Sequence, residues 1–288
     1  MSISYYNPEF WRALAPGLSI DAAPETVKPV RFGAQTLDTI SRSMFVEGYL
    51  EVPPVLNGDD LLCLRAAMES LSEHSLPAAF IYLFDQPWSL FRSIEGLISH
   101  FLGEDFKGLP NIWAWNIPKT EGASGWPIHR DCDAPTRFEN SDFGQTLMAL
   151  SVWVPLTDAT LENGCMHVLP RSRQANYPDI ITNAEAIEPL DARALPVNAG
   201  SVLAWSQDLY HWSGQVTAAA KDRRMSLSLE FQNIHFKPLA EPLFDIATPP
   251  HFEDRLKLIL CQFKKYQHME QVALPTSLRR LIEQAGDC

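Results

Sequence analysis

Two residues whose side chains commonly bind metal ions, His129 and Asp131, lie two positions apart in the sequence. In an extended segment the side chains alternate between the two faces, so this imidazole and this carboxylate would project to the same side and could hold one ion. The same spacing occurs often by chance, and Asp133 offers a competing carboxylate on the same face. The pair predicts a metal site only if a third ligand and an anchor for a co-substrate lie elsewhere in the chain.

Two further residues, His211 and Arg224, lie near the end of the central part of the chain. Two histidines and one carboxylate can form a facial triad, which leaves one side of the metal open and suits non-haem Fe(II). That opening is needed because O2 and a bidentate 2-oxo acid must bind the ion together. Residues 224–231 alternate polar and apolar side chains, which predicts a strand with Arg224 on its polar face and Arg223 on the other. A planar guanidinium there could pair with the distal carboxylate of the acid.

Short strand-like segments fill the middle of the chain, and patterns of helical period flank them. Apolar residues recur at helical spacing in four segments: 61–71, 90–101, 256–263 and 278–282. Strands are expected over 45–52, 111–117, the segment around His129, 147–155, 165–170, 201–206 and 224–231. Two stretches, 136–145 and 171–196, are expected to be loops. Strands grouped in this way predict a mainly β fold with flanking helices, in which the core is an antiparallel jelly roll, the double-stranded β-helix of cupin-like proteins.

The composition is that of an ordinary globular protein, since 46% of the 288 residues are hydrophobic and 20% are charged. We expect a single domain, 1–288, with an N-terminal arm (1–43), helices plus the jelly-roll core (44–236) and a C-terminal helical extension (237–288). The net charge of −12 argues against a nucleic-acid surface, which normally carries a basic face. No apolar run approaches the ~18 residues of a membrane span, and no signal-peptide pattern is present. We therefore expect a cytoplasmic monomer or homodimer with no nucleic-acid or membrane partner.

Five motifs follow one another along residues 44–231: the stretch 45–50, His129-x-Asp131, the run 162–170 that opens with Glu-Asn-Gly, the run 199–214 that closes with His-Trp-Ser-Gly, and Arg224-x-x-x-Ser228. In type and order they resemble the phytanoyl-CoA dioxygenase family, within the Fe(II)/2-oxoglutarate-dependent oxygenases. The chain departs from the family after the third motif, where Arg171 and Arg173 stand in place of the usual glycine and histidine. These arginines could meet an anionic substrate group or could simply be solvated.

The resemblance implies roles for seven residues. The metal ligands would be His129, Asp131 and His211. The co-substrate 2-oxoglutarate would be held by Arg224 at its C5 carboxylate, by a hydrogen bond from Ser213, and by the pocket walls Trp153 and Trp113. Trp115, Trp126 and the 136–145 loop are candidates for a substrate pocket and its lid.

The activity that the resemblance implies is that of a dioxygenase with Fe(II), 2-oxoglutarate and O2, which releases succinate and CO2. Because the carboxylate Asp131 is present, hydroxylation, desaturation or ring formation is favoured over halogenation. The acidic chain lowers the expectation of a CoA thioester, so we expect a small-molecule substrate such as an amino acid derivative or a secondary metabolite. The alternatives are a catalytically silent protein that binds a ligand or partner, and a cupin-type isomerase or hydrolase that uses the same metal ligands without 2-oxoglutarate.

Overall fold

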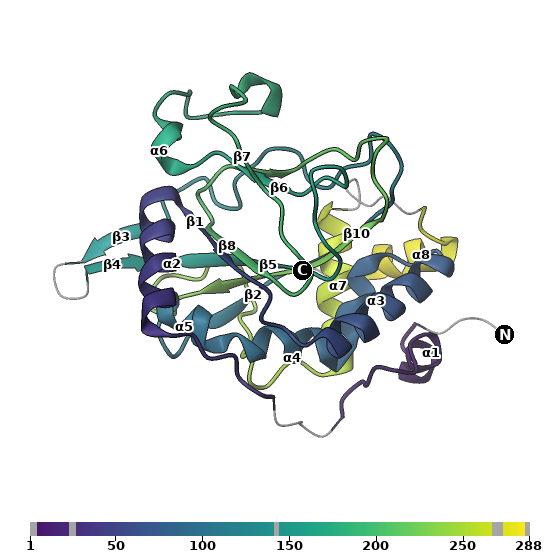
Figure 1. Cartoon of the computed structure of the whole chain (residues 1–288). Helices are drawn as coiled ribbons and strands as arrows, with labels where there is room; N and C mark the ends of the chain where they lie inside the picture. The colour runs from purple at the N-terminus through teal and green to yellow at the C-terminus, as the bar shows by residue number, and fades with distance from the viewer. Residues whose placement is uncertain (1–4, 23–26, 141–143, 267–272, 286–288) are drawn as a thin grey trace.

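The computed structural model describes residues 5–22, 27–140, 144–266 and 273–285, and its centre is a pair of facing antiparallel sheets (Figure 1). The larger sheet has the order β1 (Tyr49–Val52), β8 (Val202–Ser206), β5 (Ala149–Pro155), β10 (Arg224–Gln232), β2 (Lys107–Ile117). The smaller sheet has the order β7 (Arg193–Leu195), β6 (Met166–Val168), β9 (His211–Ser213). This arrangement confirms the predicted double-stranded β-helix, mainly β with flanking helices.

Helices gather on the outer face of the larger sheet (Figure 1). They are α1 (Pro8–Leu14), α2 (Ala34–Glu47), α3 (Gly58–Glu73), the 3-10 helix η1 (Ala78–Leu83), α4 (Asp85–Ser93), α5 (Glu95–Leu102), α7 (Phe252–Tyr266) and α8 (Thr276–Gln284). The stretch 171–196, predicted as a long loop, contains only the short helices α6 (Arg171–Gln174) and η2 (Ala184–Ala186) before β7. Among the described residues, no helix is both long and apolar enough to cross a membrane.

Strand β10 separates the helical core from the space between the sheets, because its side chains alternate between two faces. The residues that join the large apolar cluster under the helices are Met225, Leu227, Leu229 and Phe231. The intervening side chains, from Arg224 to Glu230, face the smaller sheet. All residues of β10 are buried. The polar face predicted from the alternation is therefore an inner face, and its polar groups meet a cavity instead of bulk solvent.

The N-terminal elements differ from the prediction. Residues 45–47, expected as the beginning of a strand, form the last turn of α2, and the predicted boundary at residue 43 falls inside this helix. Gly48 ends the helix in the left-handed conformation (φ 89°), its N–H donates to Met44 O at 3.0 Å, and β1 begins at the next residue. The predicted helix over 90–101 is divided at Ile94 into α4 and α5, and Gly103 follows α5.

The polar stretch 136–145, predicted as a loop, contains most of an antiparallel hairpin of β3 (Arg137–Asn140) and β4 (Gly144–Leu147). The hairpin projects from the body of the protein (Figure 1), so only a few of its side chains are buried and no apolar alternation marks it in the sequence. None of its described residues lines the cavity between the sheets, which does not support the predicted lid. Its tip, with Asp142, lies outside the described residues.

Candidate active site

The three predicted metal ligands converge between the two sheets. His211 is the first residue of β9, and His129 pairs with it through two backbone hydrogen bonds of 3.1 and 3.0 Å. This bridge is the only β-pairing that the structure assigns to the segment 126–133, so the strand predicted around His129 is a loop. Pro127 has no N–H to donate, which prevents a longer ladder. One short backbone bridge therefore brings together ligands that are far apart in the sequence.

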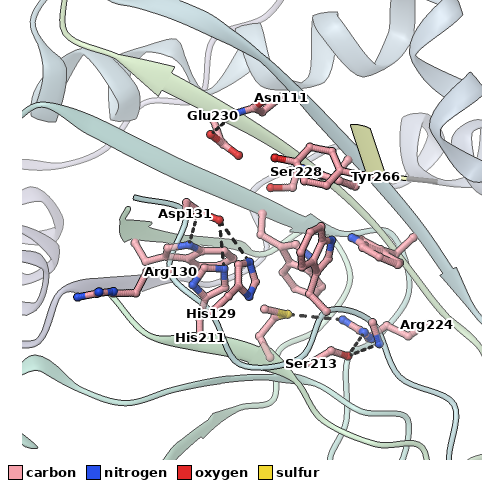
Figure 2. Close-up of a pocket in the computed structure, with 17 residues that line it drawn as sticks. Asn111, His129, Arg130, Asp131, His211, Ser213, Arg224, Ser228, Glu230 and Tyr266 are labelled. Atoms are coloured by element: carbon pink, nitrogen blue, oxygen red, sulfur yellow. Dashed lines mark hydrogen bonds and ion pairs between the residues drawn. The ribbon is translucent and has the colours of Figure 1, made fainter. Parts of the chain in front are cut away.

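The ligand atoms face one another (Figure 2). Asp131 Oδ1 lies 3.4 Å from His129 Nε2 and 3.6 Å from His211 Nε2. The opposite ring nitrogens make hydrogen bonds to backbone carbonyls, His129 Nδ1 to Pro127 O at 2.8 Å and His211 Nδ1 to Leu209 O at 3.0 Å. A carbonyl oxygen only accepts, so each Nδ1 carries the proton and each Nε2 presents a lone pair to the shared space. Two imidazole nitrogens and one carboxylate oxygen thus form the donor set of a facial triad.

Two residues that sequence reasoning missed hold the other oxygen of Asp131. Ser151 Oγ donates to Asp131 Oδ2 at 2.6 Å, and Trp205 Nε1 donates to the same atom at 3.1 Å. Burial alone would raise the pKa of Asp131, but the neighbouring His211 and His129 and the Ser151 hydrogen bond outweigh burial and hold it well below its usual range. Burial lowers the pKa of His211 to about 4, so this ring is neutral at pH 7. Both protonation states suit a bound cation.

The competing carboxylate, Asp133, is not part of this cluster. Its side chain is 94% exposed and pairs with Arg130 at 3.1 Å, whereas the side chain of Asp131 is 14% exposed. Because the segment is a loop, alternation does not place the two aspartates on one face.

Arg224, at the start of β10, is a buried cation without an anionic partner. Its side chain is almost completely buried, and no carboxylate of the described residues forms an ion pair with it. Its Nη2 donates to Ser213 Oγ at 2.6 Å and its Nη1 approaches Met166 Sδ at 3.7 Å, while its Nε has no hydrogen-bond partner in the described part of the chain. Burial lowers the pKa of Arg224 to about 10, so the group is still charged at neutral pH. Such an arrangement calls for an anion from outside the chain.

Ser213 positions this guanidinium. Its Oγ accepts from Arg224 Nη2 and from Gly125 N at 2.9 Å, and can donate to Gly214 O at 3.2 Å. A side chain at Gly125 would lie 3.1 Å from Ser213 Cβ and 3.4 Å from Arg224 Nη2, so a larger residue would crowd the pair. The Trp153 ring lies 5.8 Å from the guanidinium carbon. The structure therefore brings Ser213 and Trp153 to Arg224, as expected from the sequence.

A cavity of about 240 Å³ connects Arg224 with the triad. Six aromatic side chains line it: Trp113, Trp115, Trp126, Trp153, Trp205 and Tyr266. Trp113 packs against Trp126 and Tyr266, with ring centroids 5.1 Å away in each case. The aromatic residues expected around the site are thus present, but Trp113 belongs to an aromatic cluster of its own, separate from the contacts of Arg224.

Glu230, near the other end of β10, also lines the cavity and was missed from the sequence. Asn111 and Gln207 both donate to its Oε2, at 2.8 and 2.7 Å. Burial raises the pKa of Glu230 to about 8, and the nearby charge of Asp131 adds to the rise. The alternation over 224–231 places Glu230 on the polar face of β10. Its hydrogen-bond partners come from other segments, so the sequence gives no signal for them.

The two arginines after the third motif lie away from the cavity. Arg171 Nη2 pairs with Asp208 at 2.7 Å, and Arg173 Nε lies 3.7 Å from Asp191. Neither arginine lines the cavity. Their nearest charged partners are therefore within the protein, which favours a structural role over a contact with substrate.

Residues 59–225 match the phytanoyl-CoA dioxygenase (PhyH) family, and this match covers more than half of the chain. The chain therefore belongs to this family of non-haem Fe(II) enzymes, which use 2-oxoglutarate and O2. No curated protein matches the sequence.

Several solved structures share the fold. The non-haem α-ketoglutarate-dependent epimerase SnoN from nogalamycin biosynthesis is 19% identical, with a TM-score of 0.50 over 70% of this chain and 82% of that chain. The carbocyclase SnoK from nogalamycin biosynthesis is 16% identical, with a TM-score of 0.50 over 78% of this chain and 100% of that chain. HygX from Streptomyces hygroscopicus, solved with nickel and 2-oxoglutarate bound, is 14% identical, with a TM-score of 0.53 over 78% and 99%. At these identities the similarity shows the fold alone.

The residues present fit the cofactors of the family. Two imidazoles and one carboxylate place their ligand atoms around one point, as a divalent iron ion requires. A dianionic 2-oxo acid would supply the negative charge that the buried Arg224 lacks. The fit therefore rests on the donor set of the triad and on an orphaned buried cation.

Proposed function

We propose that the protein is a dioxygenase that oxidises a small molecule, most simply by hydroxylation, with release of succinate and CO2. The single observation that carries the proposal is Arg224, a buried guanidinium without a counter-charge, in the same cavity as an intact His-Asp-His cluster. A metal site alone would not need this cation, whereas a 2-oxo acid with a second carboxylate does. The alternative enzymes that use the triad without 2-oxoglutarate leave Arg224 unexplained.

In this proposal His129, Asp131 and His211 bind Fe(II), which when bound supplies the oxidising chemistry with O2 and 2-oxoglutarate. Asp131 is fixed for this task by Ser151 and Trp205, so that one carboxylate oxygen is left for the metal. The hydrogen bonds from Nδ1 of both imidazoles to backbone carbonyls direct each Nε2 towards the metal.

Arg224 binds the distal carboxylate of 2-oxoglutarate, and Ser213 orients the guanidinium. The Trp153 ring covers the same end of the cavity, where it excludes water and strengthens the ion pair. The keto-acid end of the co-substrate then points towards the triad. The remaining volume, between the aromatic rings and Glu230, is left for the primary substrate.

The substrate class that we favour is an amino acid derivative or a secondary metabolite. The cavity is small, and the described lining offers no basic patch for the phosphates of a CoA thioester apart from Arg224 and Arg130. The guanidinium of Arg130 is directed away from the triad (Figure 2) and pairs with Asp133.

Anaerobic titration tests the proposal directly. Fe(II) and 2-oxoglutarate together should produce a weak visible metal-to-ligand charge-transfer band in the wild-type protein, and neither reagent alone should do so. Exposure to O2 with a panel of amino acid derivatives and natural-product intermediates should then yield succinate. The absence of the band, together with the absence of succinate for every compound, would contradict the proposal.

A further inference from the structure

Glu230 and Arg224 occupy the same face of β10, near its two ends. At ~3.3 Å per residue they are roughly 20 Å apart along the strand. Figure 2 shows Asp131 between them, with Glu230 and Asn111 on one side and Arg224 and Ser213 on the other. With the co-substrate at Arg224, Glu230 lies in the part of the cavity that the co-substrate does not need.

One oxygen of Glu230 is left for a ligand. Both amide donors, from Asn111 and Gln207, go to Oε2. No donor among the described residues binds Oε1. Glu230 is nevertheless only 6% exposed, and it lines the cavity. The two amides hold one oxygen of the carboxylate and leave Oε1 free at the wall of the cavity.

The carboxylate also lacks a cationic partner. No lysine, arginine or histidine of the described residues forms an ion pair with Glu230, and the one basic group that acts on it, Lys265, lies over the Tyr266 ring at 4.9 Å. The raised pKa of Glu230 is what a buried carboxylate without a cation shows. Glu230 is thus a buried anion without a cationic partner, whereas Arg224 is a buried cation without an anionic partner.

Aromatic rings line the same cavity as this carboxylate. Asn111, Trp113 and Trp115 share one face of β2, because alternate residues of a strand point the same way. Trp113, Trp126 and Tyr266 pack edge to face with centroid distances of 5.1 to 5.6 Å, and we call these three rings the aromatic wall. Trp126 in turn stacks on the ligand His129 at 4.9 Å. Aromatic faces next to a carboxylate are a favourable environment for an organic cation.

The charges of the cavity agree with a cationic ligand. Fe(II) and dianionic 2-oxoglutarate cancel each other, and Arg224 cancels one of the two carboxylates, Asp131 and Glu230. With Glu230 ionised, one negative charge then remains. Because the pKa of the ligand-free carboxyl is about 8, Glu230 loses its proton at neutral pH as an ammonium group binds, and the ammonium group neutralises the charge. The net charge of −12 on the whole chain acts in the same direction, since it attracts cations and repels anions.

We propose that the primary substrate carries a protonated amine that binds Glu230 Oε1, with its carbon skeleton against the aromatic wall and towards the triad. The inference rests on the proposed function, because it assigns Arg224 to the co-substrate and leaves Glu230 for the substrate. It narrows the substrate class to amine-bearing small molecules and excludes anionic ones.

Calorimetric titration of the full chain with three probes of similar size tests this inference: 2-phenylethylamine, 2-phenylethanol and 3-phenylpropionate. The wild-type protein, loaded anaerobically with Fe(II) and 2-oxoglutarate, should bind the amine about tenfold more tightly than the alcohol or the acid, the scale of a charge-assisted hydrogen bond. Glu230→Gln should lose about tenfold for the amine and leave the alcohol unchanged, because the new amide can still accept from Asn111 and Gln207.

Glu104→Gln is the matched control, since it removes one negative charge at an exposed position outside the cavity. It should bind all three probes as the wild type does. The charge-transfer band and the thermal unfolding of Glu230→Gln show that the variant is folded and still binds the co-substrate. Equal binding of the three probes by the wild type, no binding of the amine, or an amine preference that survives in Glu230→Gln would overturn the inference.

The same titration without Fe(II) and 2-oxoglutarate separates this inference from the proposed function. An amine preference that depends on Glu230 in the metal-free protein, combined with no charge-transfer band in the loaded one, would overturn the function and keep the amine site. A normal band with no amine preference would overturn the amine site alone.

Discussion

The two ends of the cavity each hold one buried charge from β10, and the two charges are fixed in different ways. Arg224 is held by residues of the smaller sheet, Ser213 on β9 and Met166 on β6. Glu230 is held by Asn111 on β2 and by Gln207 just after β8, both from the larger sheet or its connections. The Arg224 end is therefore built only when the two sheets close on each other, whereas the Glu230 end is built within one sheet.

This difference matches the two ligands that we assign. The co-substrate always has the same structure, so it can be bound by a rigid clamp between the two sheets, formed by Arg224 and Ser213. A substrate particular to one enzyme contacts a carboxylate on the larger sheet and three aromatic rings, which come from β2, from the loop before His129 and from the end of α7. These side chains can change without a change in the contacts of Arg224. The triad lies between the ends, and Ser151 connects it to the Glu230 end because it pairs with Glu230 across β5 and β10.

Asp131→Ala should have the largest effect, because it removes a metal ligand that lies between the two ends of the cavity and is needed for the reaction at both. We expect Fe(II) affinity and succinate formation to fall by more than the ~10–100-fold typical of residues that only support a ligand. Asp133→Ala is the control and should leave both within about twofold, the range of ordinary surface changes. Metal-binding titrations and succinate assays measure this, and equal losses in the two variants would contradict the assignment.

Arg224→Ala should disable the co-substrate end alone. The loss of a buried ion pair to a carboxylate predicts a rise of at least about 30-fold in the KM for 2-oxoglutarate. Metal binding without 2-oxoglutarate should be retained, as should amine binding at Glu230. Arg223→Ala, at the exposed residue just before β10, should behave as the wild type. Activity that survives in Arg224→Ala would favour a metal enzyme without 2-oxoglutarate.

Ser151→Ala should have a smaller effect, since it removes one of two hydrogen bonds to Asp131 Oδ2 and leaves that of Trp205. We expect Fe(II) affinity to fall by about tenfold, with the KM for 2-oxoglutarate nearly unchanged at saturating iron. Competition with a coloured chelator measures the affinity. An unchanged affinity would show that Trp205 alone fixes the carboxylate.

Glu230→Gln should change the stability of the metal-free protein in a pH-dependent way. Because the folded pKa is raised to about 8, above the usual 4.5, the folded state binds the proton more tightly and wild-type stability falls as pH rises between these values. The variant lacks this loss, so its advantage in Tm should grow from pH 5 to pH 9 by on the order of 10 °C, because a rise of about three pKa units is about 4 kcal/mol and each kcal/mol is about 2–4 °C. Glu104→Gln should show no such growth, and a constant difference for Glu230→Gln would contradict the raised pKa.

Local patterns in the sequence predicted much of the fold and the centre of the site. The alternation over 224–231 predicted β10 and the separation of its polar face from its apolar face. The prediction failed where local signals conflict with tertiary packing. The segment 45–47 has strand-like residues but continues α2, and the exposed β3–β4 hairpin buries too little apolar surface to show a period.

By itself the sequence determined the types of the reactive groups: His129 and Asp131 by their spacing, His211 and Arg224 by the motifs around them. Only the tertiary structure decided what surrounds those groups. The backbone bridge between His129 and His211, the hold of Ser151 and Trp205 on Asp131, and the amides on Glu230 all join segments far apart in the chain. The physical reason is that side-chain alternation is set locally, whereas the register between strands is set by packing across the whole sheet.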